Sequence, residues 1–293
     1  MSGRPHRGTI FLEEAPIVAQ QAFAGNQHIL RVQAPKAAAS AMPGMFAHVQ
    51  CAPAVPLRRP LSIMRADPEA GTLEFLYKVV GDGLAQLAAR RPGETVSVLA
   101  PIGRGFELAS DRRVLLAIGG GVGIPPMIFL AERMRARTDV EQLVLMGSEV
   151  PFPFELTASR LEVAGTSAEA THAVRLLEEW GVASRLASNA GLDGCFRGYV
   201  PDLARAWLEA QPAARVAVTQ VFACGPEPML RAVAALARQF DVPCQLALEE
   251  YMACGVGGCA GCTVRVHTPS GPAMKRVCID GPVFDARDVY PDA

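Results

Sequence analysis

The segment VLLAIGGGVGIPPMIFLA, residues 114–131, decides the fold of this chain of 293 residues. Its length would suit a membrane-spanning helix, but it contains four clustered glycines and a Pro-Pro pair. Because glycine and proline interrupt regular elements, the segment predicts a buried strand, a glycine loop and then a helix. We therefore expect no membrane span here.

The glycine loop, residues 119–126, has the composition of a pyrophosphate cradle. Glycine lets phosphate groups approach the backbone, and the N-terminus of the following helix supplies N–H donors. The loop departs from the G-x-G-x-x-G dinucleotide fingerprint, because Pro125 stands where the third glycine would be. Taken alone, the loop is equally consistent with a plain tight turn.

A second turn of this kind follows the apolar stretch RVAVTQVFA, residues 215–223, and reads CGPEPM, residues 224–229. A dinucleotide that crosses the carboxyl ends of a parallel sheet would contact both turns. Without its neighbours, Cys224 would be interpreted as a buried thiol. The expected nucleotide-binding residues are Gly120, Gly121, Gly123, Cys224, Gly225 and Pro226.

The chain changes character at about residue 112. Before it, β-rich runs are separated by Pro and Gly turns, with one short helix at residues 83–91, which predicts a closed antiparallel barrel. After it, predicted strands alternate with helices, which indicates a parallel sheet with helices on both faces. An Ala-rich stretch, residues 157–183, has room for an extra helix. The predicted barrel strands include residues 46–52, 72–80 and 94–100; the later strands are 113–119, 142–148, 182–188, 215–225 and 244–250, and the later helices are 127–137, 174–181 and 227–240.

Composition narrows the class of protein. Half of the residues are hydrophobic and 19% are charged, which excludes a disordered chain. The 28 Lys and Arg nearly balance the 29 Asp and Glu, for a net charge of −1, whereas a nucleic-acid binder would carry a basic excess. Residues 1–14 include basic residues but lack the apolar region of a signal peptide, so we expect a cytoplasmic protein.

Four of the eight cysteines lie close together near the C-terminus. Cys254, Cys259, Cys262 and Cys278 are separated by four, two and fifteen residues, the C-x4-C-x2-C…C spacing of plant-type [2Fe-2S] proteins. The glycine-rich loop between the first three can curl around a cluster. A structural zinc site also uses four cysteines but more often as two C-x2-C pairs, and only one is present. The remaining four, Cys51, Cys195, Cys224 and Cys244, are expected to be small buried residues.

The stretch RRPLSI, residues 58–63, begins a predicted barrel strand. Arg59 could pair with a phosphate and the Ser62 hydroxyl could reach a ring nitrogen. In isolation, a surface arginine beside a strand explains the same residues.

With these features in order, the chain resembles the ferredoxin-NADP reductase superfamily, and more closely the PyrK family of electron-transfer subunits of class 1B dihydroorotate dehydrogenase. The stretch RPLS, residues 59–62, is similar to the family's flavin motif, and residues 76–78 to its second flavin segment. Gly83 and Leu84 stand where the family usually has Gly-Thr, so one hydroxyl contact to phosphate is missing. The resemblance implies FAD bound by Arg59, Pro60, Leu61, Ser62, Leu76, Tyr77, Lys78, Gly83 and Leu84, and a [2Fe-2S] cluster on the four clustered cysteines.

The resemblance also implies an organisation and a role. Its domains would be an FAD-binding barrel at residues 1–108, an NAD-binding α/β domain at 109–243 and a [2Fe-2S] segment at 244–293. Electrons from dihydroorotate would pass from FMN in a partner subunit through the cluster and FAD to NAD+, in a heterotetramer of two of each subunit. The alternatives are a related NAD(P)H-ferredoxin, hydrogenase or sulfur reductase subunit, or a zinc-stabilised regulatory nucleotide-binding module.

Glu149 favours NAD over NADP. It follows the second strand of the predicted nucleotide domain, and no Lys or Arg lies between Arg137 and Arg160. A carboxylate suits the free ribose 2′-hydroxyl and repels a 2′-phosphate. Alternatively, Glu149 simply faces solvent, and only the missing cation then argues for NAD.

Overall fold

An N-terminal barrel is closed by six strands in the order β1-β2-β5-β4-β3-β6, which confirms the predicted antiparallel barrel. The computed structural model describes residues 8–293; residues 1–7, on which half of the signal-peptide prediction rests, lie outside this range. The barrel elements are β1 Phe11–Phe23, η1 Ala24–Asn26, β2 Gln27–Gln33, α1 Pro35–Ser40, β3 Phe46–Gln50, β4 Arg59–Asp67, β5 Thr72–Lys78, α2 Gly81–Ala88 and β6 Thr95–Ile102.

Alternation along the strands separates the barrel interior from the surface that packs on the second domain. On β5, Leu73, Phe75 and Tyr77 belong to the barrel core, whereas Leu76 packs in the core beneath the second domain. This follows the two-residue period of a strand. Helix α1 was not predicted. Its first free N–H groups, at Lys36 and Ala37, donate to the Glu13 carboxylate, a partner distant in sequence.

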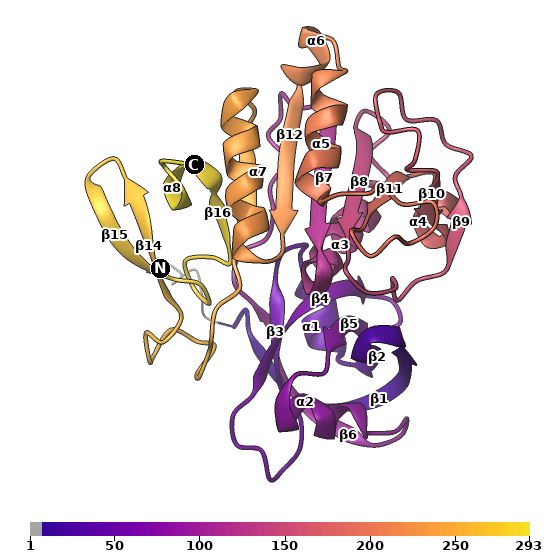
Figure 1. The fold of residues 1–293 in the computed structure, drawn as a ribbon. Coiled ribbons are helices and arrows are strands. Elements are labelled where there is room, and N and C mark those ends of the chain that lie inside the picture. The colour runs from indigo at the N-terminus through magenta and orange to yellow at the C-terminus, as the bar shows by residue number, and fades with distance from the viewer. Residues whose placement is uncertain (1–7) are drawn as a thin grey trace.

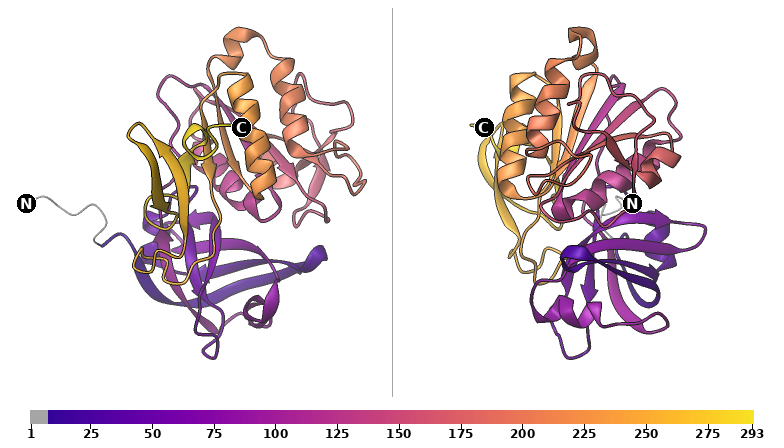
Figure 2. Two further views of the ribbon diagram at one scale, coloured as in Figure 1. Left: turned by 60° about the vertical axis from the view of Figure 1, so that its left-hand side comes forward. Right: turned by 45° about the vertical axis from the view of Figure 1, so that its right-hand side comes forward.

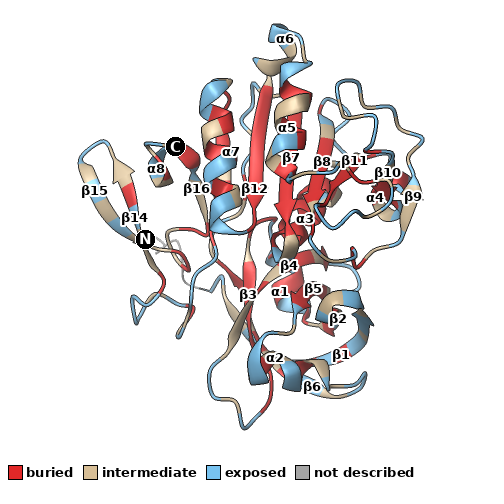
Figure 3. Cartoon of the chain, in the orientation of Figure 1, coloured by how far each residue is buried: buried red, intermediate tan, exposed pale blue. Residues whose placement is uncertain are grey.

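The second domain is a six-stranded sheet in the order β11-β8-β7-β12-β13-β16, with five parallel strands and an antiparallel β16 at its edge. Helices cover both faces, as expected, and the central strands are buried throughout (Figure 1, Figure 3). The elements are β7 Val114–Gly120, η2 Gly121–Gly123, α3 Ile124–Met134, β8 Glu141–Gly147, β9 Leu156–Ala158, β10 His172–Val174, α4 Arg175–Glu179, β11 Ala183–Ala187, α5 Val200–Glu209, α6 Ala213–Val216, β12 Thr219–Cys224, α7 Glu227–Gln239 and β13 Cys244–Ala247.

The C-terminal segment lies along both domains in the views of Figure 2. It forms a hairpin of β14 Thr263–Thr268 and β15 Gly271–Arg276, then β16 Val283–Asp285 and α8 Ala286–Val289. Strands β13 and β16 belong to the nucleotide-domain sheet, so this sheet extends past residue 243, where the sequence places the boundary. The reason is backbone pairing: β13 fills the open edge of β12, and β16 then pairs with β13.

Two sequence expectations in the second domain are wrong. Residues 215–218, predicted as strand, include the end of α6, and β12 begins only at Thr219, where pairing with β7 begins. The Ala-rich stretch 157–183 has no extra helix: it is mostly irregular, with the short strands β9 and β10 paired at its ends and α4 as its one helix. There Gly165 has a φ of 87°, and the buried Glu178 carboxylate accepts from the N–H groups of Arg160 and Leu161. In the described part of the chain, no helix has the length and hydropathy needed to cross a membrane.

The two domains are joined by an ionic contact between β4 and α3. The Nη2 and Nε atoms of Arg65 donate to one Glu132 oxygen, at 2.5 and 2.9 Å, and the guanidinium lies 5.3 Å from the Trp180 ring. The Arg65 and Glu132 side chains are 31% and 14% exposed, so solvent screens this pair only in part.

We therefore expect Arg65→Met to destabilise the protein, because it leaves the Glu132 carboxylate without its cation. Charged hydrogen bonds of this kind contribute about 1.5–3 kcal/mol. Arg137→Met is the matched control, because the Arg137–Asp139 pair is about half exposed on both sides, and such pairs contribute about 0–1 kcal/mol. Urea unfolding followed by Trp fluorescence measures both losses; equal losses would contradict the assignment of Arg65 as a domain contact.

Candidate functional site

A cavity of about 920 Å³ lies where the barrel, the sheet and the C-terminal segment meet. Its volume is in the upper part of the range of about 300–1,000 Å³ typical of ligand pockets. Most of the residues predicted to bind flavin line it. These are Arg59, Pro60, Leu61, Ser62, Leu76, Tyr77, Lys78 and Leu84.

The flavin motif begins β4, and strand pairing fixes its position. Pro60 lies opposite His48 and Ser62 lies opposite Phe46 on β3. The alternation of β4 buries Leu61 and leaves Ser62 partly accessible in the cavity. The start of β4 thus brings Pro60, Leu61 and the Ser62 hydroxyl to one wall of the cavity.

Arg59 extends to the first turn of α2. Its Nη1 donates to the Leu57 carbonyl at 2.8 Å, and its Nη2 lies 2.8 Å from the position that a Cβ on Gly83 would take. Gly83, predicted as a flavin ligand, does not line the cavity; it makes room for the Arg59 side chain. The Arg59 guanidinium lies beside the N-terminus of α2, an arrangement that suits a phosphate, and the same turn also carries the exposed Asp82.

The two nucleotide turns pack backbone against backbone. A Cβ on Gly123 would lie 2.3 Å from the Cys224 carbonyl carbon and oxygen, so only glycine permits this approach. A Cβ on Gly120 would lie 2.5 Å from the Met229 sulfur, while the corresponding position at Gly121 is open. Of the six predicted nucleotide residues, only Cys224 lines the cavity; Gly120, Gly121, Gly123, Gly225 and Pro226 do not.

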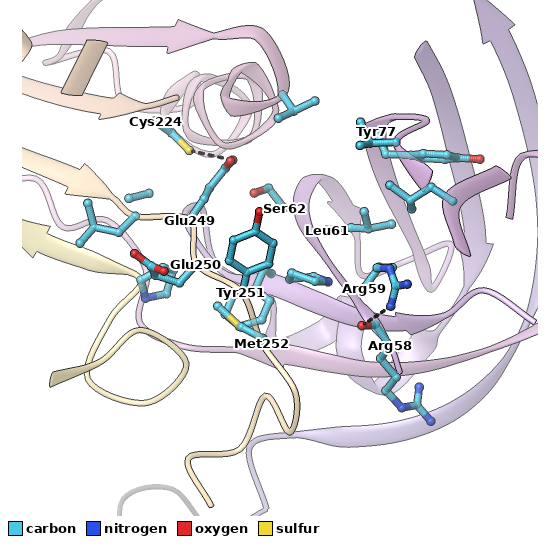
Figure 4. A pocket seen from close by; sticks show the side chains of 18 of the residues that line it. Arg58, Arg59, Leu61, Ser62, Tyr77, Cys224, Glu249, Glu250, Tyr251 and Met252 are labelled. Atoms are coloured by element: carbon cyan, nitrogen blue, oxygen red, sulfur yellow. Dashed lines mark hydrogen bonds between the residues drawn. The ribbon is translucent and has the colours of Figure 1, made fainter. Parts of the chain in front are cut away.

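Cys224 meets a carboxylate that the sequence reading missed. Its sulfur lies 3.9 Å from Glu249 Oε1, and both residues line the cavity (Figure 4). Burial, followed by the Glu249 charge, raises the pKa of the Cys224 thiol. The Glu249 side chain is accessible from the cavity, while protein atoms surround it on its other sides. This burial raises the pKa of the carboxyl group. The signal in the sequence was its place directly after β13, at the carboxyl end of the sheet.

Tyr251 and Met252, also missed, line the cavity between the flavin motif and the cysteine loop. Tyr251 projects toward Ser62 and is 93% exposed (Figure 4). Three residues beyond Tyr251 comes Cys254, the first of the clustered cysteines. The cavity therefore ends at the cysteine loop.

The structure brings the four predicted ligands together as two pairs. The Cys262 and Cys278 sulfurs are 3.4 Å apart, and the Cys259 thiol lies within hydrogen-bonding reach of Cys254. Among residues 8–293, no three His, Cys, Asp or Glu side chains gather as closely as a single metal ion requires. Two thiolates for each of two irons fit this pairing, whereas zinc takes four around one centre.

Backbone N–H groups point at these sulfurs. Val256 N lies 3.4 Å from the Cys254 sulfur, and Gly261 N lies 3.4 Å from the Cys259 sulfur. Partial burial raises the pKa of Cys254, but hydrogen bonds from the backbone of Val256, Cys259 and Gly258 outweigh it and lower that pKa to about 7. The loop turns tightly at Gly257, with φ of 78°, where a Cβ would lie 1.7 Å from Ile279 Cδ1. The residues present thus fit a thiolate-bound cluster.

Glu149 remains a sequence-level prediction. It is exposed, next to Ser148, whose hydroxyl donates to the Val150 carbonyl at 2.7 Å. It follows the carboxyl end of β8, on the side of the sheet where the nucleotide turns lie. Within residues 8–293, no charged side chain forms a hydrogen bond or an ion pair with Glu149.

Comparison with known proteins agrees with this geometry. Residues 249–290 match the family described as the iron-sulfur cluster binding domain of dihydroorotate dehydrogenase B. A relative named dihydroorotate dehydrogenase B (NAD(+)), electron transfer subunit, from Desulforamulus reducens, is 30% identical over 94% of this chain and 97% of its own length. One of the same name from Geobacillus kaustophilus is 38% identical over 84% of this chain and 86% of its own.

Among solved structures, a chain of an NADH-dependent reduced ferredoxin-NADP oxidoreductase superposes with a TM-score of 0.75 at 24% identity, covering 94% of this chain and 90% of that one. This likeness confirms the reductase fold that the motifs implied. The resemblance to the electron-transfer subunits is confirmed by the sequence relatives, each of which matches more than four fifths of this chain. The chain belongs to the family of dihydroorotate dehydrogenase B electron-transfer subunits.

Proposed function

We propose that this chain passes electrons between a [2Fe-2S] cluster, held by Cys254, Cys259, Cys262 and Cys278, and NAD+, by way of FAD in the cavity. The observation that carries the proposal is the cavity itself. Its walls include the flavin motif, Cys224 of the second nucleotide turn and the segment that leads into the cysteine loop. The flavin motif therefore borders the same space as one residue of the nucleotide turns and the segment next to the cysteines, which supports an electron path between them.

Each wall has a task. Arg59, with the first turn of α2, would hold the flavin phosphates, while Pro60, Leu61 and Ser62 would hold the ring. Cys224 and Glu249 line the side toward the nucleotide turns, where a nicotinamide would enter. When bound, FAD supplies the exchange between hydride transfer and single-electron transfer.

The partner would be an FMN-containing dihydroorotate dehydrogenase catalytic subunit, in a cytoplasmic heterotetramer of two subunits of each kind. The name of the relatives supports this, since an electron-transfer subunit requires a catalytic one. Val256, Gly258, Cys259 and Gly261 of the cysteine loop are exposed, so the cluster would lie near the protein surface. A partner that exchanges electrons with it could dock close to the loop.

Iron content tests the assignment of the cluster ligands. Cys278→Ser should lower the iron bound per chain and bleach the cluster spectrum, because one iron loses a thiolate ligand. Cys195→Ser is the control: this buried thiol lies in the nucleotide domain, outside the cysteine loop. Iron and acid-labile sulfide analysis measures both. Full iron retention by Cys278→Ser would remove it from the ligand set.

Flavin affinity tests the role of Arg59. Arg59→Ala deletes a charge-assisted phosphate contact of about 1.5–3 kcal/mol, so flavin affinity should fall roughly 10- to 150-fold. Arg91→Ala is the control, because Arg91 is exposed on the barrel and does not line the cavity. Equilibrium titration of the flavin-stripped protein with FAD measures the change. Equal affinity of the two variants would mean that the phosphates bind elsewhere.

The preference between NAD and NADP tests the role of Glu149. The unmodified protein should reduce NAD in preference to NADP, and Glu149→Arg should narrow or reverse this preference, because a cation replaces the acceptor beside the ribose. The measurement is kcat/KM for both nucleotides, with Glu162→Arg as control for an added charge on the same domain. Equal efficiency with NADP in the unmodified protein contradicts the assignment.

A further inference from the structure

His48 lies between the flavin-binding strand and the cysteine loop. On β3 it is directly opposite Pro60 of the flavin motif, and its carbonyl accepts from Arg58 Nη1 at 3.2 Å. The inward neighbours Ala47 and Val49 belong to the barrel core. His48 alternates with them, so it faces outward with Phe46, toward the C-terminal segment.

The outer face of β3 supports the cluster segment directly. Phe46 and Ile102 of the barrel belong to the same apolar core as Cys262 and Cys278. His48 places an imidazole in this contact, and its side chain is 0% exposed. A Cβ on Gly255, the residue after Cys254, would lie 2.8 Å from His48 Nδ1, so the ring packs against the backbone of the loop.

The imidazole has polar atoms that the protein leaves unused. Neither Nδ1 nor Nε2 has a hydrogen-bond partner among the described residues, although the backbone of Met252 and Arg58 lies near the ring. A buried ring nitrogen without a partner destabilises the folded state, because it loses its hydrogen bond to water and gains none in return. An apolar residue would avoid this cost in an otherwise apolar contact, so packing alone does not explain a histidine.

We infer that His48 is a positioning residue, which holds the cysteine loop in register with the flavin-binding strand through its contacts with Met252 and Gly255. The inference rests on the proposed function, since it assigns His48 a task only where cluster and flavin are both bound. A neutral imidazole has one N–H donor; the backbone of Met252 lies near the ring on the loop side without forming a hydrogen bond in this structure, and in the loaded protein it would accept from that N–H. Holding that backbone fixes where the N–H groups of the loop point, and N–H groups near the sulfurs set the potential of a cluster.

The same contact links the two redox sites through a short path. Pro60 touches the cavity, His48 is its cross-strand neighbour, and Gly255 follows the first cysteine ligand. Loss of the imidazole N–H should therefore alter the cluster and its exchange with the flavin. Hydride transfer from NADH to the flavin should be unaffected, because it takes place on the side of Cys224 and Glu249.

The test compares His48→Phe, which keeps a ring without nitrogen, with His48→Gln, which keeps a donor and an acceptor. His172→Phe is the control, since His172 lies on β10, in the nucleotide domain. Redox titration followed by electron paramagnetic resonance gives the cluster potential, and stopped-flow mixing with NADH separates flavin reduction from cluster reduction. Iron and flavin contents are measured on the same full-length samples.

For His48→Phe we expect the one-electron reduction equilibrium of the cluster to shift about tenfold toward the oxidised form, about 59 mV, and cluster reduction to slow at least tenfold. Flavin reduction should stay within about twofold, and His48→Gln should recover much of the loss. A loaded His48→Phe protein with unchanged potential and cluster reduction overturns the inference. If His48→Phe does not retain iron, His48→Gln decides: iron retention supports the inference, and loss of iron in both overturns it.

The failure of the proposed function gives a different result. An unmodified chain that binds neither iron nor flavin would contradict the proposed function itself. An unmodified chain that binds both, matched by His48→Phe in every measurement, would contradict only the role of His48.

Discussion

The pairing of β16 with β13 is the constraint on which the site depends. Leu246 lies opposite Phe284, and Ala247 lies opposite Val283, so the chain that leaves the sheet after β13 must return to the same edge. The cysteine loop and the β14–β15 hairpin lie between these two strands and have no separate core. Their buried residues, such as Val277 and Cys278, are part of the core of the sheet. A small segment that cannot bury enough apolar surface alone gains its stability in this way.

The return also attaches the segment to the barrel. Arg104 N donates to the Gly281 carbonyl at 2.6 Å, and a Cβ on Gly103 would lie 2.3 Å from Pro282 Cδ. The barrel segment and the C-terminal segment are therefore in direct contact here. Phe46 and Ile102 of the barrel share one apolar core with Cys262 and Cys278, and Ile102 Cδ1 lies beside Gly255 of the cysteine loop. The cluster site is thus built by three parts of the chain, and its distance from the flavin cavity is set by packing between them.

The glycines of the nucleotide turns serve this packing as much as ligand binding. Gly123 lets η2 pack on the Cys224 backbone. The turns that follow the paired strands β7 and β12 are thereby in direct contact. The thiol of Cys224 then reaches the cavity beside Glu249, while the glycines themselves remain behind it. A turn that resembles a phosphate cradle in sequence can therefore owe some of its glycines to the close contact of two turns.

The sequence by itself determined the order of barrel, sheet and C-terminal segment and most strands and helices, and it marked the candidate cysteine ligands and flavin motif. These depend on local patterns: alternation in strands, glycine and proline at turns, and fixed spacing between cysteines. The sequence did not predict α1, the β9–β10 sheet or the pairing of β16 with the edge of the nucleotide sheet, because partners distant in the chain decide them. Glu13, for example, caps α1 from another strand. Only the tertiary structure brought His48, Glu249 and Tyr251 to the site. No spacing marks these residues, because each comes from a different position in the fold and they meet only when the barrel, the sheet and the cysteine loop pack together.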